Sequence, residues 1–318
     1  MSVIVYIESQ DQQIKKTSLE VAAYGRAVAD AKSTSLIAVT FDLEDVEILS
    51  QYGIDKVYKV ATAEASFFDL GRYSSTLAAI ASEEEMEILI VSGSANGRYL
   101  GPAVAMKLEA NYFSNVIGLP ISYTPLEVKR SCFTNKAFSY SNSSKQKAVL
   151  SIAANTYGIF EKKVTMNQVT APYAAPLSTL KVISEEKSTQ QVSIADAEIV
   201  VSGGRGLKGP ENWHLIEDLA AVLGAATACS KPVSDMGWRP HSEHVGQTGK
   251  PVASNLYIAI GVSGAIQHLA GINSSKVKVV INNDPEAPFF KAADYGVVGD
   301  AFEVVPVLTE KLKALKGN

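Results

Sequence analysis

Short apolar runs alternate with segments of helical periodicity along this chain, and this alternation leaves few folds open to it. The first part of the chain has strand-like runs at residues 3–7, 36–41, 56–60, 88–92, 116–121, 132–140 and 148–153. Helical spacing of apolar residues occurs between them, at residues 19–31, 68–81 and 99–109. Strands that alternate with helices of this length form right-handed βαβ units and a parallel sheet. The first part is therefore predicted to be an α/β domain.

The last part of the chain repeats this plan over a shorter length. Strand-like runs occur at residues 198–201, 225–229, 256–260, 277–281 and 295–298. Helical patterns occur at residues 211–223, from 265 to 270 and from about 305 to the end. The predicted fold class is α/β, with two tandem α/β domains, of which the C-terminal one is a doubly wound parallel sheet.

A polar stretch at residues 184–191 without apolar periodicity separates the two parts, so a linker is predicted at about 184–195. The predicted domains are 1–190, a scaffold and subunit interface, and 196–318, a ligand-binding domain. A length of 318 residues agrees with about two domains at ~150 residues each. The second domain holds 14 of the 22 glycines and all four histidines, so special backbone geometry and polar chemistry are concentrated there.

Charge and composition exclude several classes of protein. The chain has 29 Lys and Arg against 33 Asp and Glu, a net charge of −4 and a pI near 5.7, so no nucleic-acid partner is expected. No apolar run approaches the ~20 residues of a membrane span, so no membrane insertion is expected. Cys132 and Cys229 have neither disulfide-framework nor zinc-site spacing. A cytoplasmic location is expected, and a processed organellar form would look the same.

A glycine-rich turn follows the first strand of the second domain. Residues 204–209 match GxGxxG between a strand and a helix, where glycines allow a pyrophosphate to approach a helix N-terminus. A tight turn without any ligand fits the same residues. The acidic residue that an NAD-binding unit needs about 20 positions later is missing, since the next strand ends in Cys229, Ser230 and Lys231. An ordinary NAD site is therefore disfavoured.

Every other strand of this domain also ends in polar or glycine-rich residues, and in a parallel sheet these ends meet at one edge. Arg205 and Lys231 can bind anionic groups, and Asp300 can accept hydrogen bonds from ribose-type hydroxyls. Side chains that can bind the edge of a heteroaromatic ring or a polyol chain are Ser230, Gln247, Thr248, Ser263, Gln267 and Asn282. This set of groups predicts a large polar nucleotide cofactor.

The same residues are open to other interpretations. A hydrolase triad of Ser263, His268 and Asp300 lacks the GxSxG elbow. His268 at the start of a helix is often a structural residue. His241 and His244 lie three positions apart without a further pair of ligands, so no metal is expected.

Several ordered stretches closely resemble the alpha subunits of electron transfer flavoproteins. They are residues 201–206, 245–250, 256–271, 281–289 and 293–300, and residues 97–111 resemble the N-terminal domain of the same family. The resemblance covers nearly the whole chain. It implies a non-catalytic electron carrier that forms a heterodimer with a beta subunit and binds one FAD. Electrons would come from dehydrogenases, such as acyl-CoA dehydrogenases, and pass to a membrane quinone reductase.

By this resemblance the second domain is the FAD-binding domain. The residues that would line the FAD are Arg205, Ser230, Lys231, Gln247, Thr248, Gly249, Ser263, Gly264, Ala265, Gln267, His268, Asn282 and Asp300. Thr248 would lie near flavin N5 and His268 near the O2 edge. The chain departs from the family pattern at Lys231, where arginine is usual, and at His244, where glutamine is common.

Two other functions remain open at this point. One is a flavin- or NAD-dependent oxidoreductase with its own small substrate, although no convincing acid/base pair is found in the N-terminal half. The other is a regulatory module whose first domain senses an adenine nucleotide.

Overall fold

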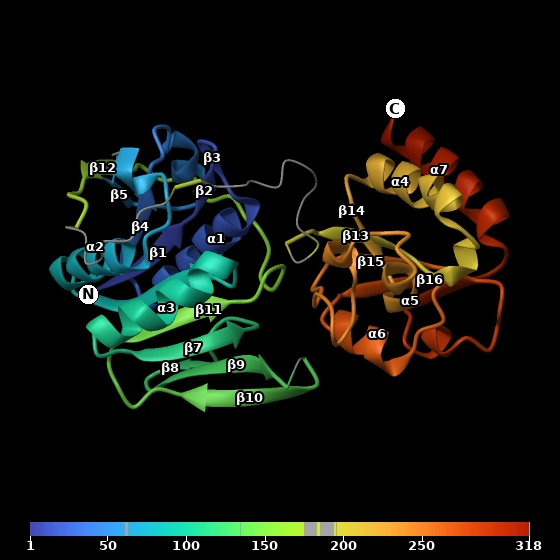
Figure 1. The fold of residues 1–318 in the computed structure, drawn as a ribbon. Coiled ribbons are helices and arrows are strands. Elements are labelled where there is room, and N and C mark those ends of the chain that lie inside the picture. Colours follow the sequence, from blue (N-terminus) through green and yellow to red (C-terminus); the bar gives the residue numbers. More distant parts are fainter. Residues whose placement is uncertain (61–62, 134, 175–182, 185–193, 195, 318) are drawn as a thin grey trace. The chain divides into compact units, whose positions relative to one another are not determined.

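The computed structural model of the chain describes residues 1–60, 63–133, 135–174, 183–184, 194 and 196–317. The chain forms two compact units (Figure 1). The N-terminal unit comprises Met1–Cys132 and Phe138–Glu186, and the C-terminal unit comprises Phe133–Ala137 and Lys187–Asn318. The predicted linker, and with it the predicted end of the first domain at residue 190, lies mostly outside the described residues.

One large sheet forms the centre of the N-terminal unit. Seven strands run parallel in this order: β7 (Asn111–Val116), β11 (Ala148–Ile152), β6 (Met86–Ser92), β1 (Ser2–Ile7), β4 (Leu36–Phe41), β5 (Lys56–Val60) and β12 (Asn167–Thr170). At the β7 side, β9 (Leu126–Cys132) pairs antiparallel with β7 and β8 (Ser122–Tyr123), and β10 (Ala137–Asn142) forms the edge. A small antiparallel pair, β2 (Ser9–Gln10) and β3 (Gln13–Ile14), precedes the first helix.

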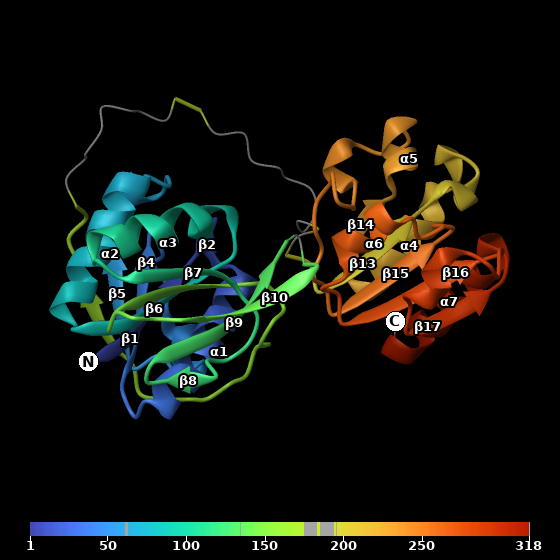
Figure 2. The same ribbon diagram turned by 90° about the horizontal axis from the view of Figure 1, so that it is seen from below.

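Helices cover both faces of this sheet, as Figure 2 shows from below. Helix α1 (Lys16–Ala31) packs on one face, and α2 (Leu70–Glu83) with α3 (Ala95–Lys107) packs on the other. Side chains alternate along β1, so Val3, Val5 and Ile7 face α1, whereas Ile4 and Tyr6 face α2 and α3. Burial on both faces explains why β1 and β4 are continuous apolar runs in the sequence. Short 3₁₀ turns are η1 (Glu47–Gln51) and η2 (Ala63–Ala65).

Two strand predictions in this unit were wrong. The run at 116–121 is the end of β7 followed by an irregular segment, because Gly118 and Pro120 interrupt it and pairing with β11 uses residues 111–116. The run at 132–140 is not one strand, since Phe133 and Asn135 adopt left-handed backbone conformations between β9 and β10. Strand β11 lies inside the sheet, between β6 and β7.

The C-terminal unit has a five-stranded, fully parallel sheet. Its strands are β14 (Ala226–Cys229), β13 (Ile199–Gly203), β15 (Leu256–Ile260), β16 (Val277–Asn282) and β17 (Tyr295–Val298), in that spatial order. From β13 the chain first adds β14 on one side and then crosses to add β15 on the other side, so the strand order reverses between β13 and β15. The crevice at such a reversal, which we call the switch point, is where doubly wound sheets bind ligands.

Helices α4 (His214–Leu223) and α7 (Ala301–Lys316) pack on one face of this sheet, and α6 (Ile266–Ile272) lies on the other with the segments around Val252 and Phe289. Short elements at the strand ends are η3 (Arg205–Leu207), η4 (Pro210–Trp213), α5 (Lys231–Asp235), η5 (His241–Glu243) and η6 (Pro288–Lys291). The closing helix begins at Ala301, four residues before its predicted start, because the Asp300 carboxylate accepts a hydrogen bond from Phe302 N. The predicted fold class is confirmed. None of the helices in the described ranges has the length and apolar character needed to cross a membrane.

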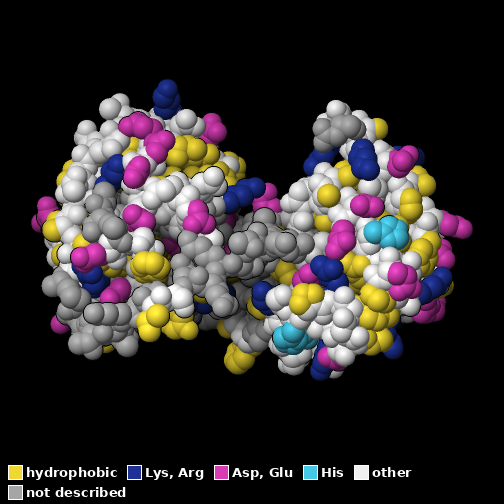
Figure 3. Space-filling model, turned by 45° about the horizontal axis from the view of Figure 1, so that its top comes forward, with side chains coloured by type: hydrophobic (Ala, Val, Ile, Leu, Met, Phe, Trp, Pro, Cys, Tyr) yellow, Lys and Arg dark blue, Asp and Glu magenta, His cyan; other side chains and the backbone are white. Residues whose placement is uncertain are grey.

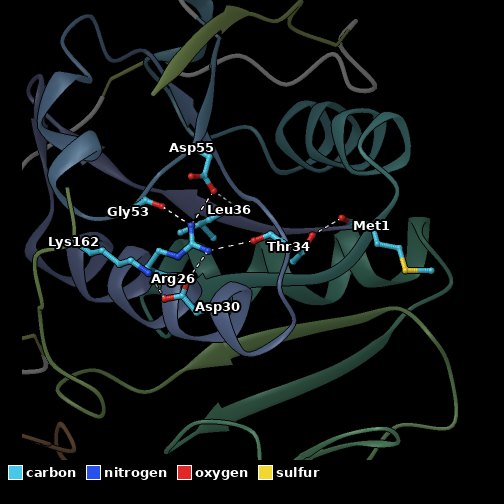
Figure 4. A network of polar contacts seen from close by, with 8 residues as sticks. All are labelled: Met1, Arg26, Asp30, Thr34, Leu36, Gly53, Asp55 and Lys162. Atoms are coloured by element: carbon cyan, nitrogen blue, oxygen red, sulfur yellow. Dashed lines mark hydrogen bonds and ion pairs between the residues drawn. The ribbon is translucent and has the colours of Figure 1, made fainter. Parts of the chain in front are cut away.

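Arg26 joins three segments of the N-terminal unit (Figure 4). Its Nη1 donates to the Gly53 carbonyl at 3.1 Å and to Asp55 Oδ2 at 2.9 Å, and its Nη2 donates to the Thr34 carbonyl at 3.2 Å. The Asp55 carboxylate also accepts a hydrogen bond from Leu36 N at 2.8 Å. This network fastens α1 to the start of β4 and to the segment before β5.

We expect Arg26→Met to lower the free energy of unfolding of the N-terminal unit by about 2–3 kcal/mol, because it leaves two carboxylates, those of Asp30 and Asp55, and two carbonyls without their charged donor. Urea unfolding followed by circular dichroism measures this change. Tryptophan fluorescence provides an internal control, since Trp213 and Trp238 both lie in the C-terminal unit and their transition is expected to stay in place.

The matched control is Lys162→Met. Lys162 also pairs with the Arg26 network, through Asp30 at 2.7 Å, but its side chain is 54% exposed. Its loss is expected to cost at most ~0.5 kcal/mol. If the two substitutions lowered the free energy of unfolding equally, the contacts of Arg26 would contribute no more than an exposed ion pair.

Candidate functional site

A cavity of about 500 Å³ opens at the carboxyl ends of the strands of the C-terminal unit. It is lined by the loops that follow β13, β14, β15 and β16 and by residues 244–248. Eleven of the thirteen predicted site residues are among its lining residues: Arg205, Ser230, Lys231, Gln247, Thr248, Ser263, Gly264, Ala265, Gln267, His268 and Asn282. The tertiary structure thus brings together, in one place, residues that are up to 77 positions apart in the sequence.

Gly249 and Asp300 are not among the lining residues. A Cβ atom at Gly249 would meet the His244 carbonyl oxygen at 2.3 Å, so this glycine lets the loop from His244 to Lys250 close on itself. Asp300 caps α7, and its carboxylate lies 3.8 Å from Lys208 Nζ. Contacts of these two residues with a cofactor stay predictions.

The glycines at the switch point are explained by the packing of two backbone turns. Gly204 N donates to the Ile260 carbonyl at 2.9 Å, and Gly206 N donates to the Gly261 carbonyl at 3.1 Å. A Cβ atom at Gly206 would lie 2.7 Å from Gly261 Cα. Side chains at these two positions are therefore excluded by the neighbouring turn, which accounts for the first two glycines of the GxGxxG pattern without a phosphate.

Gly264 has a similar packing role. Its φ is +84°, and a Cβ atom would lie 2.5 Å from Phe289 N. The missing side chain thus faces the η6 segment. It sets the direction in which Ser263 and the first turn of α6 approach the cavity.

The rim of the cavity carries exposed cationic and polar side chains. Arg205 follows β13, and Lys231 begins α5 directly after β14. The other exposed polar side chains in the lining are Gln247, Thr248, Ser263, Gln267 and the acidic Asp284. Cations bind phosphate or other anionic oxygens, and hydroxyl and amide groups bind the edge of a heteroaromatic ring.

Asn282 belongs to the buried part of the lining. Its Nδ2 donates to the Val262 carbonyl at 3.0 Å, and its Oδ1 accepts from Asp284 N at 3.0 Å. Asn282 therefore ties the loop after β16 to the loop after β15. This cross-link holds the two loops in place at the cavity.

His268 is a buried imidazole at the same cavity. Its Nε2 lies 3.0 Å from the hydroxyl of Tyr257, whereas its Nδ1 has no hydrogen-bonding partner of normal geometry in the described residues. Burial, reinforced by the nearby His244, lowers the pKa of His268 to about 4, although the backbone of Val245 acts in the opposite direction. The ring is therefore neutral at pH 7.

His244 is a second buried imidazole in the lining, and the sequence prediction left it out. It is 2% exposed, and its Nδ1 also has no hydrogen-bonding partner among the described residues. Burial, followed by repulsion from His241, lowers its pKa below the ordinary value. Its position directly before the predicted 245–250 stretch is the signal that could have identified it.

The remaining lining residues that were not predicted are Gly206, Pro232, Val245, Gly246, Gly261, Val262, Asp284 and Ala287. All but Ala287 lie within two positions of a predicted residue, whereas Ala287 lies five positions after the end of β16. In the described part of the chain, no group of three or more His, Cys, Asp or Glu side chains is arranged to hold a metal ion.

These features fit a flavin adenine dinucleotide. Two rim cations match a pyrophosphate, and exposed hydroxyl and amide groups match the many acceptors and donors of a flavin and its polyol chain. Two buried imidazoles with unpartnered nitrogens leave hydrogen-bonding capacity for a polar ligand.

Models of two protein domains match the chain. Residues 3–184 match the electron transfer flavoprotein domain, and residues 193–273 match the electron transfer flavoprotein FAD-binding domain. The second match contains most of the cavity-lining residues. FAD is thereby confirmed as the cofactor of this domain.

Two relatives with similar sequences match nearly the whole chain. The chain is 34% identical over 317 residues to a protein of Bacillus subtilis named electron transfer flavoprotein subunit alpha, with 98% of each chain covered. It is 35% identical to the protein of the same name from Syntrophomonas wolfei, with 97% of this chain and 98% of the relative covered. The mitochondrial protein of that name from Dictyostelium discoideum is 53% identical over 133 residues, which are 42% of this chain and 38% of the relative. The resemblance predicted from the sequence is confirmed, and the chain belongs to the family of electron transfer flavoprotein alpha subunits.

Proposed function

We propose that this chain holds the FAD of a two-subunit electron carrier, with the cavity at the carboxyl ends of β13 to β16 as the cofactor site. The observation that supports this site most strongly is the convergence of eleven predicted residues on one cavity. The proposed function is electron transfer, without turnover of a substrate of its own. A yellow protein whose bound FAD is reduced only by a partner dehydrogenase is the expected finding.

Each part of the cavity has a separate task in this proposal. Arg205 and Lys231 at the rim bind the anionic groups of the cofactor. Thr248 and Gln247 orient the flavin ring, and the buried neutral His268 provides a hydrogen-bonding group at its pyrimidine edge. FAD, when bound, supplies the redox chemistry. The chain's own contribution is to position it and to set the charge around it.

The partners are also part of the proposal. The names of the relatives as alpha subunits support a beta subunit as partner. Dehydrogenases, such as acyl-CoA dehydrogenases, are the proposed electron donors, and a membrane quinone reductase is the proposed acceptor. Basic side chains are interspersed with acidic ones on the face shown in Figure 3, which supports the expectation that nucleic acid is not a partner. The cytoplasmic location stays a prediction.

Arg205→Gln is expected to weaken FAD binding by about 10- to 100-fold, because a charge-assisted hydrogen bond contributes roughly 1.5–3 kcal/mol. Titration of the FAD-free chain with FAD, followed by quenching of flavin fluorescence, measures this change. The control is Lys208→Gln, which removes a neighbouring exposed cation that does not line the cavity. Equal affinities of wild type and Arg205→Gln would place the anionic part of FAD elsewhere.

Lys231→Ala is expected to lower the two-electron midpoint potential of the bound FAD, since a nearby cation stabilises the negative charge that reduction adds. A tenfold change in the equilibrium corresponds to about 30 mV for two electrons. Lys231→Arg keeps the charge and is expected to keep the potential near that of the wild type. Potentiometric titration with absorbance detection tests this, with Lys250→Ala as the control outside the lining. An unaltered potential in Lys231→Ala would remove Lys231 from this role.

The stability of the FAD-free C-terminal unit is expected to fall as the pH falls from 6.5 to 4. In this window the unfolded chain binds a proton at His268, whose folded pKa is about 4, while the folded chain does not. The total loss is roughly 3 kcal/mol, at about 1.4 kcal/mol per pH unit. Urea unfolding followed by tryptophan fluorescence at several pH values measures it. His268→Gln should lose this part of the pH dependence, whereas His214→Gln should retain it; identical pH profiles of all three proteins would contradict the burial of His268.

A further inference from the structure

Three histidines lead from the surface of the C-terminal unit to the cofactor cavity. His241 is exposed, whereas His244 and His268 are buried and line the cavity. The rings of His241 and His244 have centroids 5.2 Å apart and are tilted by 58°. We propose that His244, supplied with protons through His241, takes up one proton when the bound FAD is reduced and releases it when the FAD is oxidised. This inference rests on the proposed function.

The backbone around His244 is held firmly. His244 N donates to the His241 carbonyl at 3.1 Å, and the His244 carbonyl accepts from Lys250 N at 2.8 Å. Residue 244 also forms a parallel bridge with Cys229 at the end of β14. The backbone of residue 244 is thus attached to the end of β14, which fixes the point from which the imidazole enters the cavity lining.

The side chain of His244 lies next to α6. A Cβ atom at Gly246 would be 3.4 Å from His244 Nε2 and 3.7 Å from His268 Cα, so the two imidazole residues flank the same glycine. Gly246 in turn packs against Gly271 of α6, where a Cβ atom would lie 2.6 Å from Gly246 Cα. Glycines at both positions allow the loop and the helix to approach so closely.

A proton on His244 would be an unpaired charge in the folded protein without reduced cofactor. The titratable and charged groups around it are His241 on η5, Lys231 and Asp235 on α5, His268 on α6, and the Cys229 thiol on β14, whose pKa burial raises to about 12. The carboxylate of Glu243, which directly precedes His244 in the sequence, is paired with Arg239, with 2.6 Å between Nη2 and Oε1. Of the described groups that shift the pKa of His244, Asp235 alone favours the protonated ring, and burial together with the nearby cationic groups outweighs it.

Reduction of the cofactor changes this balance. Two electrons from the donor and one proton from the solvent go to the cofactor, which becomes more negative. A second proton moves from the solvent by way of His241 and forms an N–H bond at the unprotonated ring nitrogen of His244. The attraction between the new charges stabilises both. Oxidation by the acceptor reverses each transfer, so no group is consumed.

The test uses the full-length chain loaded with FAD, together with the beta subunit proposed as its partner. The midpoint potential is measured from pH 5.5 to 8 for the wild type, His244→Gln, His241→Gln and His214→Gln. The wild type is expected to take up two protons per two electrons in the window between the oxidised-state and reduced-state pKa of His244, and about 30 mV per pH unit accompanies each proton. His244→Gln should take up one proton, whereas His214→Gln, which changes an exposed histidine outside the cavity, should take up two.

His241→Gln tests the path of the proton, through His241, separately from the group that takes it up, His244. It is expected to keep the equilibrium uptake of two protons but to slow proton uptake after rapid reduction by several-fold. Histidine ring signals in NMR spectra provide a second readout, in which the pKa of His244 should rise on reduction. Equal slopes for wild type and His244→Gln, or a pKa of His244 that does not change on reduction, would overturn the proposal. Failure of the chain to bind FAD would instead overturn the proposed function.

Discussion

The close contact of two backbone turns at the switch point of the C-terminal sheet determines the arrangement of the whole site. Gly204 and Gly206 after β13 approach Gly261 after β15 so closely that a Cβ atom on either side would collide with backbone. The hydrogen bond from Gly206 N to the Gly261 carbonyl holds this contact. Arg205 and Ser263 leave the sheet from these turns, so their positions at the cavity follow from it. A larger residue at the contact would move both loops.

Polarity changes from the rim of the cavity to its interior. Cations and hydroxyl groups lie at the exposed rim, where their charge costs little because water still solvates them. The interior holds imidazoles and an amide, which are polar groups that can be buried in a neutral form. A cofactor placed here would meet charge at its phosphate end and adjustable hydrogen-bonding groups at its ring. This gradient is the physical basis for binding a large, asymmetric nucleotide in one orientation.

The N-terminal unit uses the same architecture differently. At the carboxyl end of β1 the buried Glu8 accepts hydrogen bonds from the hydroxyls of Ser92, the last residue of β6, and Ser94, and Lys15 Nζ lies 3.5 Å from its carboxylate. Side chains of the unit itself thus occupy the place between β1 and β6 where its strand order reverses. The expectation that this domain serves as scaffold and subunit interface is consistent with that arrangement and stays a prediction.

The sequence by itself determined the kind of fold and the edge of the sheet at which the site lies. Apolar runs such as 36–41 and 256–260 correspond to β4 and β15, because strands buried on both faces must be continuously apolar. The rule that parallel strand ends converge was enough to collect Arg205, Lys231 and Asn282 from distant segments, whereas His268 was assigned to the site by the family resemblance.

Tertiary structure alone decided the rest, because contacts between distant segments have no local sequence signal. The strand at 111–116 was displaced from its predicted place by pairing with β11, and the glycines at 204 and 206 proved to serve loop packing. His244 entered the site, and Asp300 became a helix cap, through the paths that their loops take in space. Which polar side chains are buried, and which of their atoms lack partners, likewise depends on how these loops pack together.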